Sequence, residues 1–96
     1  MNVSYHPAVR RDVRNILRHY DEISIQLGDA FWDELQALIE QARANPERFH
    51  PTDRGLRRAN MGNFPYHFLY RVRPGGIRII VVKHHERHPG YGSTRL

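Results

Sequence analysis

The chain has no cysteine, and this absence excludes two kinds of architecture. No disulfide framework can hold a small fold together, and no thiolate is present to bind a structural metal. Long apolar runs are also missing, because no stretch approaches the ~20 apolar residues of a membrane-spanning helix. The sequence opens without an apolar, signal-like segment, so we expect a cytoplasmic protein that does not contact a membrane.

Negative charge is nearly absent from the second half of the sequence. Residues 54–96 contain eight arginines and one lysine but a single acid, Glu86, which gives this segment a net charge of +8. Residues 1–53 carry a net charge of −3. A positive field that is segregated in this way attracts phosphates or an acidic protein and raises the rate of encounter. The alternative is that surplus arginine only keeps a small protein in solution.

The length and composition indicate one folded unit. At 96 residues, with 40% hydrophobic and 26% charged residues, the chain fits a single globular domain, which we take as residues 1–96. No internal repeat or low-complexity tract divides it.

Two helices are predicted in the first half. The first begins near Pro7, and its apolar stripe consists of Val9, Val13, Ile16, Leu17 and Tyr20. The second covers about residues 25–44, and its apolar stripe consists of Leu27, Phe31, Leu35, Leu38 and Ala42. Trp32 lies at the edge of the second stripe. We expect this side chain to be partly buried in the core, and the alternative is an anchor for a protein partner.

Strands are predicted for residues 2–5, for residues 56–61 and for both arms of a hairpin across residues 64–83. The order β-α-α-β-β-β predicts an α+β fold, in which a helical hairpin packs on one face of a mainly antiparallel four-stranded sheet. The Pro74-Gly75-Gly76 turn separates the two arms, and the second arm is apolar on both faces, as a central strand would be.

The alternation in the first arm separates its side chains into two sets. The set expected to face the helices is Tyr66, Phe68, Tyr70 and Val72, and the opposite set is His67, Leu69, Arg71 and Arg73. The length of the turn leaves the register open by one residue. Either Lys83 or His84 therefore shares a face with His67.

The candidate chemistry lies on and after this hairpin. Adjacent strand histidines point to opposite faces, so His84-His85-x-x-His88 does not predict a metal site, and we predict neither a metal nor another cofactor. Cleavage of RNA by its own 2′-OH needs a base, an acid and cations but no metal. The residues that could supply these roles are His67, His85, Arg87 and Tyr91. The alternative is that His67 lies on an exposed sheet face and that the segment after the hairpin only contacts solvent.

The element order resembles that of the RelE/ParE superfamily, the toxins of type II toxin–antitoxin systems that are often described as plasmid stabilisation proteins. The resemblance covers nearly the whole chain. It rests on two patterns, Phe64-Pro65-Tyr66-x-x-x-Tyr70-x-Val72 and His84-x-x-Arg87-x-Pro89-x-Tyr91-x-x-x-Arg95. It implies a small basic toxin that a cognate acidic antitoxin neutralises, present as a homodimer or as a hetero-oligomer with that antitoxin. The RelE-like branch cuts mRNA on the ribosome, and the ParE-like branch poisons DNA gyrase.

Two sets of site residues follow from the resemblance. If the protein is a metal-independent RNA endonuclease, an mRNA interferase, its catalytic residues would be His67, His85, Arg87 and Tyr91. Its substrate-binding residues would be Arg58, Arg71, Lys83, His84 and Arg95. RelE-like enzymes often carry an arginine where His67 stands and another basic residue where His85 stands. These histidines either act as acid and base or mark the loss of nuclease activity.

The Phe-Pro-Tyr strand and the His-x-x-Arg-x-Pro tail favour the ParE-like side. The sequence therefore predicts a growth-inhibiting toxin that acts on gyrase or on ribosome-bound mRNA. A non-toxic, basic nucleic-acid-binding module is the alternative. We expect the antitoxin to place an acidic segment over the sheet face and tail of the +8 half.

Overall fold

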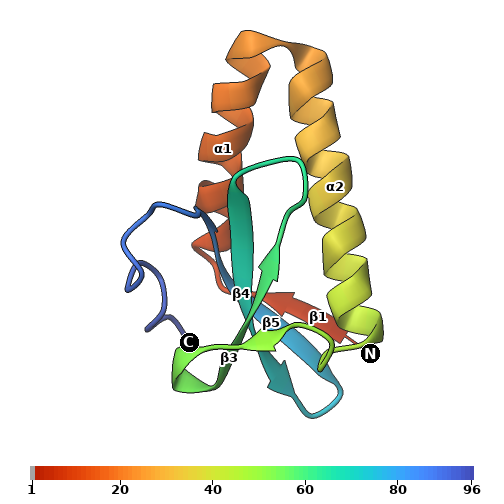
Figure 1. Ribbon diagram of the computed structural model, residues 1–96, viewed down its shortest axis with the longest axis vertical. Coiled ribbons are helices and arrows are strands. Elements are labelled where there is room, and N and C mark those ends of the chain that lie inside the picture. The colour runs from red at the N-terminus through yellow and green to blue at the C-terminus, as the bar shows by residue number, and fades with distance from the viewer. Residues whose placement is uncertain (1) are drawn as a thin grey trace.

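Two helices pack on one face of a five-stranded sheet in the computed structural model, which describes residues 2–96 (Figure 1). The elements are the strands β1 (Asn2–Tyr5), β2 (His50–Pro51), β3 (Leu56–Asn60), β4 (Tyr66–Arg73) and β5 (Gly76–His84), the helices α1 (Val9–Ile23) and α2 (Ile25–Ala44), and a turn of 3-10 helix over Asp53–Gly55. The sheet order is β1-β5-β4-β3-β2. Strand β1 runs parallel to β5, and all other neighbours are antiparallel. The predicted α+β class is confirmed.

The prediction of four strands was wrong by one. The additional strand, β2, has two residues, His50 and Pro51, which pair with Arg58 and Arg57 of β3. Two residues carry no alternation of apolar and polar side chains, and a polar connection that contains proline gives no strand signal.

Ser24 separates the two helices. Its extended backbone (φ −163°) ends α1, and its hydroxyl oxygen accepts a 3.0 Å hydrogen bond from the Leu27 N–H, which caps α2. Helix α1 begins at Val9, close to Pro7 as predicted, and just before it His6 Nδ1 accepts a hydrogen bond from the Ala8 N–H at 3.0 Å. The helices then form an antiparallel hairpin, which makes up the upper part of Figure 1.

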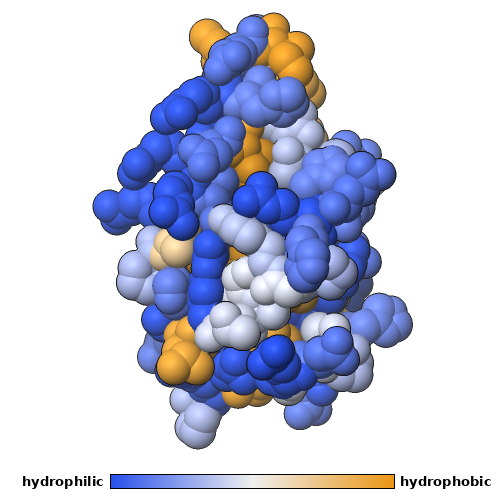
Figure 2. All heavy atoms as spheres, turned by 90° about the vertical axis from the view of Figure 1, so that its left-hand side faces the viewer, coloured by the Kyte–Doolittle hydropathy of each residue, from blue (hydrophilic) through white to orange (hydrophobic). Residues whose placement is uncertain are grey.

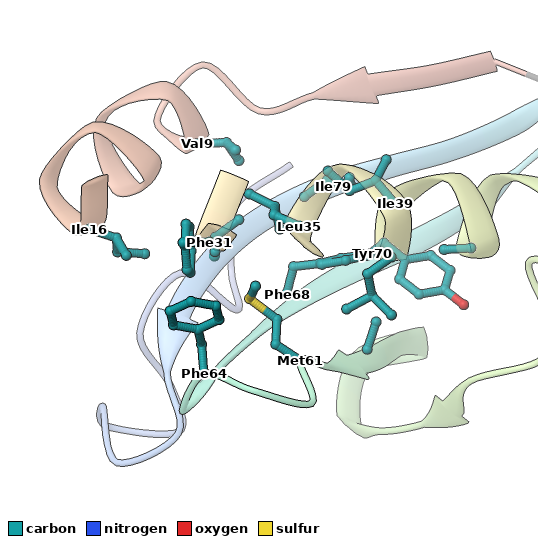
Figure 3. Packing of buried hydrophobic residues seen from close by; sticks show 14 of the residues in the cluster. Val9, Ile16, Phe31, Leu35, Ile39, Met61, Phe64, Phe68, Tyr70 and Ile79 are labelled. Carbon is teal, nitrogen blue, oxygen red and sulfur yellow. The ribbon is translucent and has the colours of Figure 1, made fainter. Parts of the chain in front are cut away.

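The main core lies between the helical hairpin and one face of the sheet (Figure 3). Phe31 of α2 is fully buried, with its ring 5.6 Å from that of Tyr20 and edge-on to that of Phe64 at 5.3 Å. Tyr70 is also fully buried, and its hydroxyl donates a 2.6 Å hydrogen bond to the Pro46 carbonyl. The only polar atom of this large side chain is therefore satisfied. The prediction that alternate aromatic residues of β4 face the helices is confirmed for Tyr66, Phe68 and Tyr70.

Two side chains expected in this core lie outside it. Val72 is 39% exposed, because it stands close to the β4–β5 turn at the end of β4. Trp32 is 44% exposed, so the prediction of a core tryptophan was wrong. Its position at the edge of the helix stripe turns the indole outward.

A second, smaller core covers the other face of the sheet. It consists of Leu56, Leu69, Ile80 and Val81, with Tyr91 of the C-terminal tail packed against them. The tail is defined here as residues 85–96.

An irregularity in the β4–β5 pairing builds this second core. Leu69 pairs with Val81 and Tyr70 with Ile79, so Ile80 has no partner on β4. Both Ile80 and Val81 therefore belong to the second core. The alternative reading, in which His67 lies on an exposed sheet face and the tail only contacts solvent, was wrong, because His67 is buried and the tail folds back over the sheet.

Candidate functional site

The tail is fixed to the sheet by a buried lysine. Lys83 of β5 is 5% exposed, and its ammonium group donates to the carbonyl oxygens of Pro89 (2.8 Å), Tyr91 (2.9 Å) and His88 (3.4 Å). These bonds use all three ammonium protons. Burial lowers the pKa of Lys83, and neighbouring arginines lower it further. Lys83 therefore holds the tail and supplies charge, but it has no proton left for a ligand.

A buried ion pair fixes the end of the tail to α1. Arg95 Nη1 lies 2.7 Å from Asp12 Oδ2 and 3.1 Å from the Ile80 carbonyl oxygen. The same Asp12 oxygen accepts a 3.2 Å hydrogen bond from the Val82 N–H. Both backbone groups lie on β5 beyond Ile79, the last residue that pairs with β1. The ion pair thus takes the place of strand pairing along this part of the β5 edge.

Other predicted substrate-binding residues also make internal contacts. Arg71 donates a 3.1 Å hydrogen bond to the Arg54 carbonyl, and the His84 ring lies edge-on to that of Tyr66 at 5.1 Å. Of the five predicted substrate-binding residues, Arg58 and Lys83 line one pocket, which is described below, and the other three do not: Arg71, His84 and Arg95.

A pair of histidines lies at the centre of the remaining candidates. His67 pairs directly with Lys83 across β4 and β5, which answers the question of register, and it is 2% exposed. Its Nδ1 is 3.0 Å from Nδ1 of His85, and the two rings are nearly parallel at 5.2 Å. Arg58 Nη2 lies 3.3 Å from the same His85 nitrogen.

Arg58 determines which ring nitrogens of the pair carry protons. A guanidinium group can only donate, so His85 Nδ1 must be the acceptor and carries no proton. The contact between the two Nδ1 atoms then requires a proton on His67 Nδ1. We therefore assign the Nδ1–H tautomer to His67 and the Nε2–H tautomer to His85. Nε2 of His67 is left as a free acceptor.

The surroundings keep both imidazoles neutral. Burial lowers the pKa of His67 to about 3, and the charges of Arg58, His85 and Lys83 act in the same direction. Burial and Arg58 also lower the pKa of His85. An acid or base is most effective when its pKa is near the working pH. A His67 with a pKa of about 3 is poorly matched to proton transfer near neutrality.

These residues line a small cavity between β3, β4, the 3-10 turn and the tail, which we call the histidine pocket. Its volume is about 270 Å³, and the polar side chains around it include Arg54, Arg58, His67, His85, Arg87 and Ser93. The sequence singled out four of these six. Arg54 and Ser93 were missed because no pattern predicts that the 3-10 turn and the tail close over the same strands.

Tyr91 and Arg87 contact each other within the tail and stabilise its conformation. They do not face each other across the pocket. The Arg87 guanidinium carbon lies 4.0 Å from the centre of the Tyr91 ring, and that of Arg95 lies 5.2 Å from it. The ring also packs against the second core. Tyr91 therefore anchors the tail through contacts with two cations and with the second core. Of the predicted catalytic set, the histidine pocket gathers His67, His85 and Arg87.

A second, larger depression, which we call the helix groove, lies along the helical hairpin. Its volume is about 1160 Å³, and it runs from Tyr5 and Val82 at the sheet to Leu17 and Trp32 on the helices. One wall carries arginines spaced four residues apart on α1: Arg10, Arg14 and Arg18. Figure 2 shows the hydrophilic outer face of this helix, with apolar side chains gathered at the hairpin tip. The sequence showed the spacing but not the groove, because the separation of the helices is set by tertiary packing.

Within residues 2–96, no group of three histidine, aspartate or glutamate side chains is placed to hold a metal ion. Neither helix in this part of the chain is long and apolar enough to cross a membrane.

Comparisons with known proteins agree with this architecture. A family model described as the ParE toxin of the type II toxin–antitoxin system parDE matches residues 3–89. Among solved structures, the chain is similar to one from the chromosomal ParDE toxin–antitoxin system of P. aeruginosa, with a TM-score of 0.74 and 18% sequence identity. The match covers 88% of this chain and 95% of the other. A search of curated protein sequences found no significant match.

Proposed function

The chain belongs to the family of ParE toxins of type II toxin–antitoxin systems, and on this premise we propose that it arrests growth by poisoning DNA gyrase in the cytoplasm. The family match over residues 3–89 carries this proposal, because the ParE-like branch of the superfamily acts on gyrase and is not known as a nuclease. The match includes the Phe-Pro-Tyr strand and the tail as far as Pro89.

The state of the histidine pair also supports a non-catalytic mechanism. Cleavage of RNA would need one group to accept and another to donate a proton. His67 is buried, with a pKa of about 3, and its Nδ1–H is already donated to His85. Tyr91 contacts two guanidinium groups, those of Arg87 and Arg95, and packs against the second core. Such residues suit a rigid binding surface better than proton transfer.

Ribosome-dependent mRNA cleavage is the second candidate, and one observation favours it. His67, His85, Arg58 and Arg87 come from three separate segments and line one pocket. Cationic side chains around such a pocket could stabilise charge that develops on a phosphate. In this case His85 would have to act as the acid or base, since it is the more exposed of the two histidines.

We further propose that the antitoxin docks an acidic amphipathic helix in the helix groove. The groove has an apolar floor that includes Val13 and Leu35. Its charged lining consists of three arginines along α1 and two carboxylates at the end of α1: Arg10, Arg14, Arg18, Asp21 and Glu22. A helix with carboxylates beside an apolar stripe is complementary to such a surface. The sheet face expected from the sequence to receive the antitoxin is covered largely by the tail of the chain itself.

Expression in bacteria tests the proposed target. Induction of the chain should arrest growth and trigger a DNA-damage response, and mapping of transcript ends should show no new cleavage sites. The double variant His85→Ala, Tyr91→Ala distinguishes the two candidates, provided that circular dichroism shows it to be folded. Retained toxicity supports gyrase, whereas loss of toxicity together with loss of mRNA cuts identifies the nuclease. Binding to nucleic acid without growth arrest would indicate a non-toxic binding module.

A further inference from the structure

From the geometry of the histidine pocket, we propose that it binds a phosphate group that still carries a proton, with His67 Nε2 accepting the P–O–H hydrogen bond. The arginines around the pocket would bind the anionic oxygens. This site does not depend on gyrase or on cleavage of RNA.

The pocket offers a set of unused donors. Within residues 2–96, the guanidinium groups of Arg54 and Arg87 donate no hydrogen bond to the protein, although Arg87 lies over the Tyr91 ring. Arg58 uses Nε on Asn60 and Nη2 on His85, which leaves Nη1 free. Guanidinium groups match the geometry of phosphate oxygens. The donors therefore predict an oxyanion as the ligand.

The charge around the pocket is strongly positive. Arg54, Arg58, Arg87 and Lys83 all line it, against one carboxylate, that of Asp53. The Lys83 ammonium group donates all of its hydrogen bonds to carbonyl oxygens of the tail. It therefore contributes positive charge to the pocket but makes no hydrogen bond to the ligand. With a volume of about 270 Å³, the cavity is smaller than the roughly 300–1,000 Å³ of ordinary small-molecule sites. It suits a single phosphate group rather than a nucleotide base.

One acceptor among these donors makes the site selective. His67 Nδ1 carries the proton donated to His85, so Nε2 has a lone pair. Within residues 2–96, every side-chain nitrogen or oxygen that is fully buried has a hydrogen-bond partner. His67 Nε2 has no partner, so this atom is not fully buried. It must therefore open onto the pocket that His67 lines. Orthophosphate near neutral pH keeps at least one P–O–H group, whereas sulfate has none. A lone pair at this place favours phosphate over sulfate and repels an oxygen that lacks a proton.

Calorimetric titration of the full-length chain at pH 7 and constant ionic strength tests the proposal. Orthophosphate should bind about tenfold more tightly than sulfate. This is the difference expected when the His67 Nε2 acceptor receives a hydrogen bond from phosphate but receives none from sulfate. His67→Asn keeps an N–H near the Nδ1 position but removes the Nε2 acceptor, so this ratio should fall to about one. Arg87→Gln should weaken both anions alike, and Arg11→Gln, outside the pocket, should change neither.

Equal binding of phosphate and sulfate by the unchanged chain would overturn the proposal, and so would a ratio that His67→Asn leaves intact. If His67→Asn does not fold, nitrogen NMR of the unchanged chain replaces it. Phosphate but not sulfate should then shift the His67 Nε2 resonance, and a resonance that moves with neither anion rules the site out. Tighter binding of a 5′-phosphorylated oligonucleotide than of its unphosphorylated form would identify a strand end as the source of the ligand. Binding of orthophosphate alone would identify the free anion.

Discussion

At the scale of single residues, His67 shows how burial changes what a histidine can do. It stands on β4 under the tail, opposite Lys83 and in contact with His85. The sequence identified His67 and His85 as candidate catalytic residues and Lys83 as a candidate substrate-binding residue, and it left an exposed His67 as the alternative. The burial could not be foreseen, because it depends on a tail without periodicity that folds back through the carbonyl contacts of Lys83.

The depressed pKa of His67 predicts a pH-dependent stability. In the unfolded chain the group has its ordinary pKa of 6.5, and in the folded chain the pKa is about 3, so the unfolded state binds more protons between these values. The stabilisation is therefore fully present above about pH 6.5 and is lost as the pH falls toward 3. The slope should approach about 1.4 kcal/mol per pH unit. Urea unfolding at several pH values between 7 and 4 measures it.

His67→Asn should remove this contribution, because asparagine does not titrate. The comparison of interest is the difference in slope between the variant and the unchanged chain, since carboxylates titrate equally in both. His50→Asn, at an exposed position on β2, serves as the matched control and should leave the slope as it is. Parallel pH profiles for the unchanged chain and His67→Asn would show that the pKa of His67 is not depressed.

At the scale of elements, the tail packs over one face of the five-stranded sheet and does not extend freely into solvent. Arg95 and Asp12 link it to α1 and to the open part of the β5 edge, and Tyr91 seals the second core. Helices and strands were predicted well, because their apolar spacing is regular. The bulge at Ile80 and the tail were not, since each depends on single long-range contacts.

The buried ion pair between Asp12 and Arg95 should couple the tail to the fold. Arg95→Met leaves a buried carboxylate without its cation, so we expect the free energy of unfolding to fall by about 3–5 kcal/mol. The double variant Asp12→Leu, Arg95→Met removes both charges and should cost less than the two single changes together. Urea unfolding at pH 7 measures all three variants. Strictly additive effects would show that the two groups do not interact.

At the scale of the whole molecule, the protein has two candidate binding surfaces that differ in charge and shape. The strands and tail carry the +8 segment and the histidine pocket, and the helical hairpin carries the groove. The asymmetry of charge was visible in the sequence. The groove was not, because the separation of the two helices is set by tertiary packing. Val13 and Leu17 pack against the main core as the stripe predicts, and they also line the depression.

The groove predicts a specific pattern of antitoxin binding. Arg14→Glu places a negative charge on the wall of the groove and should weaken binding of the cognate antitoxin by about tenfold, mainly through a slower association rate. Arg11→Glu makes the same change of charge on the outer side of α1, away from the groove, and is the matched control. Surface plasmon resonance at two salt concentrations measures both rates. Equal effects of the two variants would place the antitoxin elsewhere.

The whole-molecule proposal, poisoning of DNA gyrase by a toxin that is not a nuclease, is tested most directly with purified components. Gyrase, relaxed plasmid and ATP are incubated with the purified chain, and supercoiled and cleaved plasmid are measured on a gel. The account predicts loss of supercoiling and accumulation of cleaved plasmid, abolished by the antitoxin and retained in His67→Asn. Supercoiling at the normal rate in the presence of a chain that stops growth in cells would contradict it.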